Sequence, residues 1–338
     1  MHGAKSFLMK PAARFLVGIP VTLIVAWWSL ALAFRLPGPA WLAQGAAALF
    51  AVTMLGVLVF VRPFRKALGI AFLVMGGVLI WWSTIRPSNN RNWLPEVARA
   101  PSAEIDGDKL VVRNVRNFDY RSETDFTERW EDRTYDLSKL QGVDIFISYW
   151  GSPYIAHPVV SWDFGDGQHL AMSIETRKER GEEYSAVRGF FREYELVYIA
   201  ADERDIVRVR TNYRGEEVYL YRVRLRPGIG RKLLVAYLEQ ANKLAAQPEF
   251  YNAALDNCTT GIRLNVQHIG AAQPWDYRIL VNGLADQMLY ERGNIDTSMP
   301  FEQLKAASLI VDKAKAADQA ADFSQRIRAG LPEPGPLE

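Results

Sequence analysis

Cys258 is the only cysteine in this chain of 338 residues, and it lies in the stretch FYNAALDNCTTGIRLNV (250–266). Asp256 or Asn257 is a good N-cap, so a helix is expected from Cys258 to about His268. A thiol in a first helical turn faces unpaired backbone N–H groups and the positive end of the helix dipole, which lower its pKa from about 8.5. With no second cysteine to pair with, the thiol is either a nucleophile or a small buried hydrophobic group.

A thiolate nucleophile usually works with a histidine, and the chain has four: His2, His157, His169 and His268. His2 precedes the first apolar segment. His268 ends the helix of Cys258, about 15 Å along it, and so cannot reach the thiol. His169 directly follows a predicted turn, where a surface position is expected. His157, within a predicted strand, is therefore the better candidate for the general base.

Residues 155–176 form two β-rich runs around a Gly-Asp-Gly sequence at 165–167, which predicts a hairpin. A three-residue turn would place His157 opposite Glu175. A two-residue Asp-Gly turn would place it opposite Thr176 instead. In either register a carboxylate or a hydroxyl is available to orient the imidazole ring, as a base that activates a thiol requires.

Other chemistries have less support in the sequence. Zinc sites normally show at least one close ligand pair, and the chain has neither CxxC nor HxxxH, so neither a metal nor another cofactor is expected. The 40 basic and 38 acidic residues give a net charge of +2 without a basic stripe, so no nucleic-acid partner is expected.

Three uncharged segments, at 15–34, 41–61 and 67–85, are each about as long as a helix that crosses a hydrocarbon core. Basic residues gather before the first segment and at 62–66, which places both regions in the cytoplasm by the positive-inside rule. Three crossings then put the rest of the chain outside the cytoplasmic membrane. We therefore expect an inner-membrane protein of a bacterium with a periplasmic C-terminal domain.

The expected organisation is a membrane domain at 1–86, a Pro- and Asn-rich linker at 87–103, a folded domain at 104–325 and a disordered tail at 326–338. Strand-like segments come first in the folded domain and helices follow, which indicates the α+β class. Strands are expected at 109–120, 144–150, 155–176, 195–202 and 216–225. Helices are expected at 231–247, 258–268, 280–293 and 308–328.

Long motifs in this domain resemble the periplasmic domain of the Lnb-type lipoprotein N-acyltransferases. The motifs are NWLPEVA (92–98), NVRNFDYRSETDF (114–126), IAHPVVSWDFGDG (155–167), SIETRKERGEEYSAVRGFFREYELVYIAADERD (173–205) and YNAALDNCTTGIR (251–263). The order of a histidine strand before a cysteine helix is similar to a circularly permuted papain-like (NlpC/P60-like) fold. Permuted relatives often carry a second histidine across the hairpin, where this chain has Glu175.

The resemblance implies a cysteine acyltransferase in which Cys258 is the nucleophile and His157 the base, and we assign Glu175 as the orienting residue. Acyl groups of a phospholipid would pass through a thioester to the amine of a lipoprotein or peptide. Two alternatives remain: a thiol amidase or peptidase of cell-wall peptides, and a non-catalytic membrane-anchored binding domain with an unreactive cysteine.

Overall fold

The computed structural model describes residues 11–271 and 273–335. These residues form two compact units, which we describe separately. The helical unit contains the chain up to Ser88 and the segment Ser185–Glu193, and the α+β unit contains the remainder. Three residues used for the orientation (His2, Lys5 and Lys10) and the last three residues of the expected tail lie outside the described residues.

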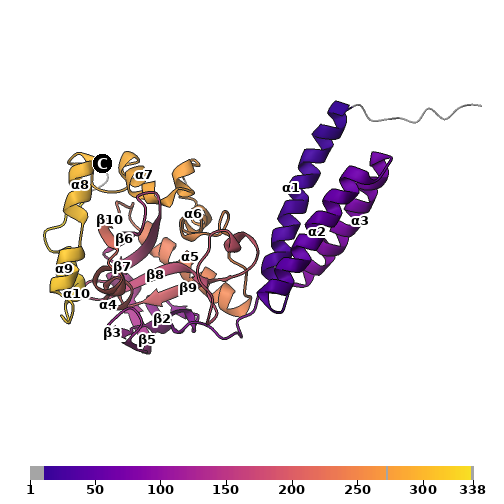
Figure 1. The fold of residues 1–338 in the computed structure, drawn as a ribbon. Helices are drawn as coiled ribbons and strands as arrows, with labels where there is room; N and C mark the ends of the chain where they lie inside the picture. Colours follow the sequence, from indigo (N-terminus) through magenta and orange to yellow (C-terminus); the bar gives the residue numbers. More distant parts are fainter. Residues whose placement is uncertain (1–10, 272, 336–338) are drawn as a thin grey trace, which may run out of the picture. The chain divides into compact units, whose positions relative to one another are not determined.

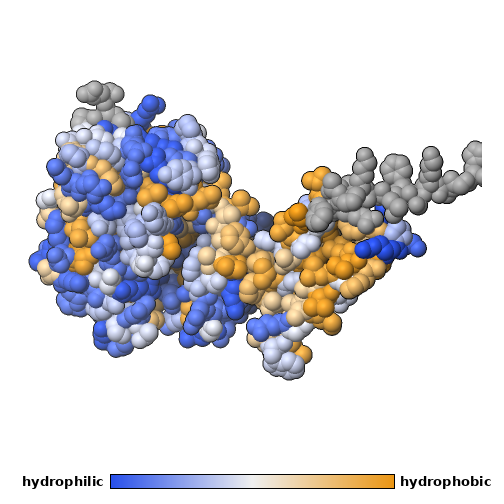
Figure 2. All heavy atoms as spheres, turned by 45° about the horizontal axis from the view of Figure 1, so that its top comes forward, coloured by the Kyte–Doolittle hydropathy of each residue, from blue (hydrophilic) through white to orange (hydrophobic). Residues whose placement is uncertain are grey.

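The helical unit contains three helices that are long and apolar enough to cross a membrane, as predicted. Small and flexible side chains, among them Val21, Met54 and Ala71, pack where the helices meet. Large apolar side chains point outward, and Figure 2 shows hydrophobic residues over much of this unit. A lipid environment removes the cost of exposing such a surface to water. The helices are α1 (Pro11–Arg35), α2 (Ala40–Phe60) and α3 (Phe64–Thr84).

The α+β unit is built on an eight-stranded sheet with the order β1-β2-β9-β8-β7-β6-β10, in which β5 also pairs with β2 (Figure 1). All neighbouring strands are antiparallel except β2 and β9. The strands are β1 (Ser102–Asp106), β2 (Lys109–Arg116), β5 (Trp130–Asp136), β6 (Gly142–Tyr149), β7 (Ala156–Asp163), β8 (His169–Arg177), β9 (Glu195–Ala201) and β10 (Glu217–Arg222), with β3 (Asp119–Tyr120) and β4 (Phe126–Thr127) in a separate ribbon.

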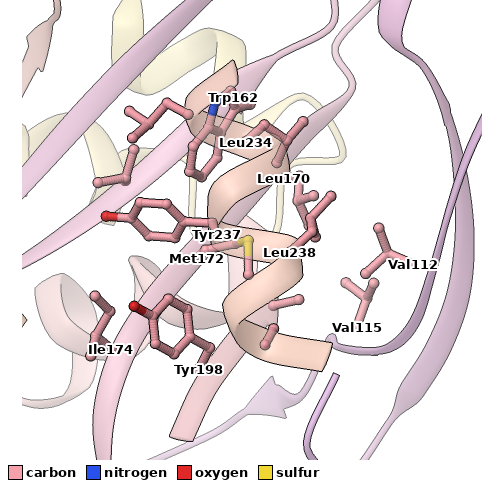
Figure 3. Packing of buried hydrophobic residues seen from close by; sticks show 14 of the residues in the cluster. Val112, Val115, Trp162, Leu170, Met172, Ile174, Tyr198, Leu234, Tyr237 and Leu238 are labelled. Atoms are coloured by element: carbon pink, nitrogen blue, oxygen red, sulfur yellow. The ribbon is translucent and has the colours of Figure 1, made fainter. Parts of the chain in front are cut away.

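Helices cover both faces of the sheet. On one face, α5 packs Leu234 and Tyr237 against Trp162 and Met172 of the sheet (Figure 3), and α6 joins the same core. The other face is covered by α4, α9 and α10. The predicted α+β class is therefore confirmed. The helices are α4 (Glu203–Ile206), α5 (Ile229–Ala246), α6 (Cys258–His268), α7 (Ala285–Glu291), α8 (Phe301–Ser308), α9 (Val311–Ala316) and α10 (Phe323–Arg328), with a π-helical turn η4 (Val209–Tyr213) after α4.

The hairpin of β7 and β8 has the three-residue turn. The Phe164 N–H donates to the Gln168 carbonyl, and the pairing proceeds through Val159 opposite Ser173. Gly165, Asp166 and Gly167 all have positive φ, which glycine adopts without strain and aspartate tolerates. If the register is continued by two residues beyond this pair, His157 lies opposite Glu175. The two-residue turn, which would have placed Thr176 opposite His157, is therefore excluded.

Two segments expected to be irregular are packed into the α+β unit. Within the expected linker at 87–103, Trp93 and Val97 are buried, and β1 begins at Ser102. At the other end, α10 extends to Arg328 and buries Ile327, inside the expected tail. In both places apolar side chains among polar neighbours supply the buried contacts that hold the chain in place.

The segment Ser185–Glu193, which connects β8 to β9, packs with the helical unit rather than with the sheet. The ring of Phe191 is buried, with its centroid 4.5 Å from that of Trp27 in α1. The guanidinium of Arg192 donates to the carbonyl of Trp82 in α3 at 2.8 Å. An apolar ring and a charged donor therefore attach this loop to two different membrane helices.

Candidate active site

Cys258 is the first residue of α6, as predicted. The side-chain oxygen of Asn257 accepts hydrogen bonds from the backbone N–H groups of Thr259 and Thr260, at 3.0 and 2.9 Å, and caps the helix. Gly261 lets α6 approach the sheet closely, because an added Cβ would lie 2.7 Å from Ile174 of β8. The cap and the close packing fix the thiol at the positive end of the helix dipole.

The imidazole of His157 on β7 is buried, and it and the Cys258 thiol shift each other's pKa. Its Nε2 lies 2.6 Å from the hydroxyl oxygen of Ser173 and 3.0 Å from Oε1 of Glu175, both on β8. The Ser173 hydroxyl donates its one hydrogen to Glu175, at 2.7 Å, so it accepts from the ring. Nε2 therefore carries a proton, which leaves Nδ1 as the ring nitrogen available to exchange a proton.

The charges around this pair favour a thiolate–imidazolium form. Burial lowers the pKa of His157, but the negative charge of Glu175 outweighs burial and raises that pKa to about 9. Burial raises the pKa of Cys258, but hydrogen bonding and the charge of His157 outweigh it and lower the thiol pKa below its ordinary value. Burial also acts to raise the pKa of Glu175, yet the charge of His157 keeps that carboxyl ionised. Both shifts therefore favour a proton on the ring over a proton on the thiol.

A buried ionic network continues beyond Glu175. The guanidinium of Arg210, in η4, lies 3.3 Å from the Glu175 carboxylate and 3.1 Å from that of Glu216. Glu216 in turn accepts a hydrogen bond from Ser148 of β6. Arg210 is thus held between two carboxylates, and it contacts the same oxygen of Glu175, Oε1, as His157 does.

The regular pairing of β7 with β8 ends at Val159 and Ser173, before it reaches His157. At this end of β7 the N–H of Ala156 donates to the side-chain oxygen of Asn282, at 3.0 Å. The amide nitrogen of Asn282 donates to the Cys258 sulfur, at 3.6 Å. The side chain of Asn282 therefore takes the place of a β8 backbone group as the hydrogen-bond partner of Ala156, and it also contacts the Cys258 sulfur.

Asn282 was not among the predicted site residues, because a continuous helix was expected over 280–293. That prediction was wrong at its start: Asn282–Leu284 form a 3₁₀ turn and α7 begins at Ala285. The Asn282-Gly283 dipeptide is a turn signal that could have marked this break. Ser173 also carried a signal, since it lies two residues before Glu175 on the same face of the strand.

The other two described histidines lie away from the thiol. His169 is opposite Asp163, with its Nε2 3.6 Å from that carboxylate, beside a cavity of about 650 Å³ that contains neither Cys258 nor His157. The expected surface position for His169 was wrong, because only 8% of the residue is exposed. His268 ends α6 in an exposed position, 3.6 Å from Glu239.

Comparison with known proteins assigns the segment that carries these residues. A family model described as the Lnb N-terminal periplasmic domain matches residues 126–283. This segment is an Lnb-type periplasmic domain. Neither the curated proteins nor the solved structures contain a match to the chain.

The Lnb domain begins at β4 and ends within the Asn282 turn, so it contains Cys258, His157, Glu175 and Asn282. Together with the three apolar helices, the domain identifies a membrane-associated protein with a periplasmic C-terminal part. Within residues 11–271 and 273–335, no group of three or more potential metal-ligating side chains occurs.

Proposed function

We propose that this protein is a cysteine acyltransferase of the bacterial inner membrane, which transfers an acyl chain from a phospholipid to the amine of a lipoprotein or peptide. The observation that carries the proposal is the linked set of Cys258, His157 and Glu175. A thiolate at a helix start, paired with an imidazolium that a carboxylate orients, is the arrangement that nucleophilic catalysis by cysteine requires. The chain that carries this thiol also carries three helices that are able to anchor it in a membrane.

The proposed reaction has two halves. The Cys258 thiolate attacks the ester carbonyl carbon of the donor, a C–S bond forms, and the C–O bond to the glycerol breaks. The proton on Nδ1 of His157 goes to the departing glycerol oxygen, which leaves a thioester on the enzyme. In the second half the acceptor amine attacks the thioester, His157 takes the proton from the amine nitrogen, and the C–S bond breaks. The products are an amide and the regenerated thiolate.

The test is intact-mass analysis of the full chain purified from membranes, before and after neutral hydroxylamine, which cleaves thioesters. We expect a fatty-acyl adduct on Cys258 that hydroxylamine removes. Cys258→Ala should abolish the adduct, and His157→Ala should slow its formation about 100-fold or more. His169→Ala is the matched control, because it removes a buried histidine that does not contact the thiol, and it should leave the adduct unchanged.

The donor and the acceptor are tested by incubation with a phospholipid that carries deuterated acyl chains and with a diacylated cysteinyl peptide. Deuterated N-acyl peptide supports the proposal, and the same peptide with a blocked amine should give none. Unlabelled N-acyl peptide would identify the peptide's own ester as the donor. Free fatty acid or cleaved peptide without an amide product would favour the thiol hydrolase. A Cys258 that forms no adduct and is alkylated slowly at neutral pH would favour the non-catalytic domain.

A further inference from the structure

The amide group of Asn282 is oriented by a hydrogen bond that allows only one arrangement. The backbone N–H of Ala156 is a donor, so the atom that faces it must be the amide oxygen of Asn282. The amide NH₂ then points to the other side, where it meets the Cys258 sulfur at 3.6 Å. An N–H donor is therefore fixed next to the reacting atom. The side chain of Asn282 is only partly buried.

The turn that contains Asn282 is hydrogen-bonded to the segment between β6 and β7 and to the end of β6. The N–H of Gly283 donates to the Tyr154 carbonyl at 3.1 Å, and the Gly283 carbonyl accepts from the Tyr149 hydroxyl at 3.0 Å. The contact is so close that a Cβ on Gly283 would lie 2.3 Å from the carbonyl oxygen of Pro153. Because these contacts hold the turn in place, we expect that Asn282 does not need to reorganise when a substrate binds.

The backbone N–H of Cys258 is a second donor close to the sulfur, because it belongs to the same residue. Asn257 caps the N–H groups of Thr259 and Thr260, and the N–H of Cys258 itself is not among the groups that it caps. When a thiolate adds to a carbonyl carbon, negative charge develops on an oxygen bonded to that same carbon, within about 3 Å of the sulfur. A donor close to the sulfur is thus also close to the position of this oxyanion.

We propose that the side-chain amide of Asn282, together with the backbone N–H of Cys258, stabilises the oxyanion that forms when Cys258 attacks an acyl carbonyl. This inference rests on the proposed acyl transfer and adds to it a catalytic residue that touches the reacting atoms. The two residues then have different roles: His157 transfers the proton, and Asn282 stabilises the negative charge on the oxyanion. Both halves of the reaction pass through such an oxyanion, so both depend on Asn282.

The experiment compares two reagents on the full chain in detergent. p-Nitrophenyl butyrate acylates Cys258 through an oxyanion, and its leaving group departs without a proton. Iodoacetamide alkylates the same thiolate at a CH₂ carbon, where no oxyanion forms. For Asn282→Ala we expect acylation to slow about 100-fold, as for the loss of one oxyanion donor in other enzymes. Alkylation at its high-pH plateau should change less than about threefold, since the thiolate itself remains.

Two further variants secure the interpretation. Asn282→Asp keeps an oxygen for the Ala156 N–H but has no N–H to offer, so acylation should slow as much as in Asn282→Ala while the melting temperature is kept. Asn242→Ala is the matched control, because Asn242 also bonds backbone groups, the N–H and carbonyl of Ala103, but does so away from the thiol. Its acylation rate should stay within about threefold of the wild type.

Parallel losses of acylation and alkylation would overturn the inference in favour of a structural role for Asn282, and an unchanged acylation rate would overturn it outright. Either result would leave the proposed acyl transfer intact, provided that the wild-type thiol is acylated. A wild-type thiol that reacts with neither reagent would instead overturn the proposed function, and this inference with it.

Discussion

The carboxylate of Glu175 lies 3.0 Å from Nε2 of His157, on the strand next to it. Because this negative charge raises the pKa of His157 to about 9, the imidazolium is present at neutral pH and is lost as the pH rises through about 9. Acylation by an unactivated ester needs that proton for its leaving group, so the acylation rate should fall above this pH.

Glu175→Gln should therefore move the alkaline limb of the rate profile to lower pH. Without the charge, burial dominates, and the pKa of His157 drops to its ordinary value of about 6.5 or below. Alkylation of Cys258 at pH 7 should also slow, since less imidazolium is present to stabilise the thiolate. The pH dependence of both rates is the measurement. Glu104→Gln, at an exposed carboxylate paired with Arg113, is the control and should change neither profile.

Ser173→Ala should slow acylation about 3- to 10-fold, the effect of one lost hydrogen bond. The hydroxyl bridges His157 and Glu175, but the direct contact between those two residues remains without it. The alkaline limb should accordingly stay near pH 9. A limb that shifts as far as in Glu175→Gln would show that the serine, rather than the carboxylate, sets the pKa of the ring.

Arg210→Met should destabilise the α+β unit by about 3 kcal/mol or more, because it leaves the buried carboxylate of Glu216 without its cation and leaves Glu175 with His157 alone. The melting temperature in detergent measures this loss. Adding Glu216→Gln to the variant should recover part of the stability, because it removes the buried carboxylate that has lost its cation. Arg113→Met, which breaks an exposed ion pair, should cost less than about 1 kcal/mol, and an equal cost for both arginines would contradict the prediction.

Gly283→Ala should lower both stability and thiol acylation. The new Cβ would collide with backbone atoms of Pro153 and Tyr154, which cannot move aside as a side chain can. We expect a loss of about 1–3 kcal/mol, as for other overpacked sites, together with a displaced Asn282. Gly335→Ala has open space around it and serves as the control. Wild-type stability in Gly283→Ala would show that the turn is less rigid than its contacts indicate.

The orientation in the membrane is tested with reporter fusions. A reporter active only outside the cytoplasm should be active when fused after residue 338 and inactive when inserted at 62–66, the basic segment that leads into the first turn of α3. The reverse pattern would place the Lnb domain in the cytoplasm and remove the basis for a periplasmic substrate.

Much of the site follows from local rules that a sequence displays. The Asn257 cap and the position of Cys258 depend on adjacent residues, and the Gly-Asp-Gly turn fixes the hairpin register that brings His157 to Glu175. Each of these relationships is set by the geometry of one helix end or one turn, so a single sequence is sufficient to predict it.

The remaining parts depend on contacts between distant segments. Arg210 reaches Glu175 from a π-helical turn, and Asn282 reaches Cys258 from 24 residues further along the chain. No local sequence pattern predicts a contact between residues so far apart in the chain. Strands β1 and β5 were missed for a different reason: both are largely exposed and rich in charged residues, so they lack the alternation that marks a half-buried strand.

The loop Ser185–Glu193 divides the sequence of the α+β unit into two parts. Because this loop packs with the membrane helices, the chain passes between the two units three times, at 88/89, 184/185 and 193/194. Strand β9 begins only two residues after Glu193, and two residues of extended chain span about 7 Å. β9 pairs with β8, which carries Ser173 and Glu175. The α+β unit is therefore not one continuous stretch of the chain, because residues 185–193 interrupt it.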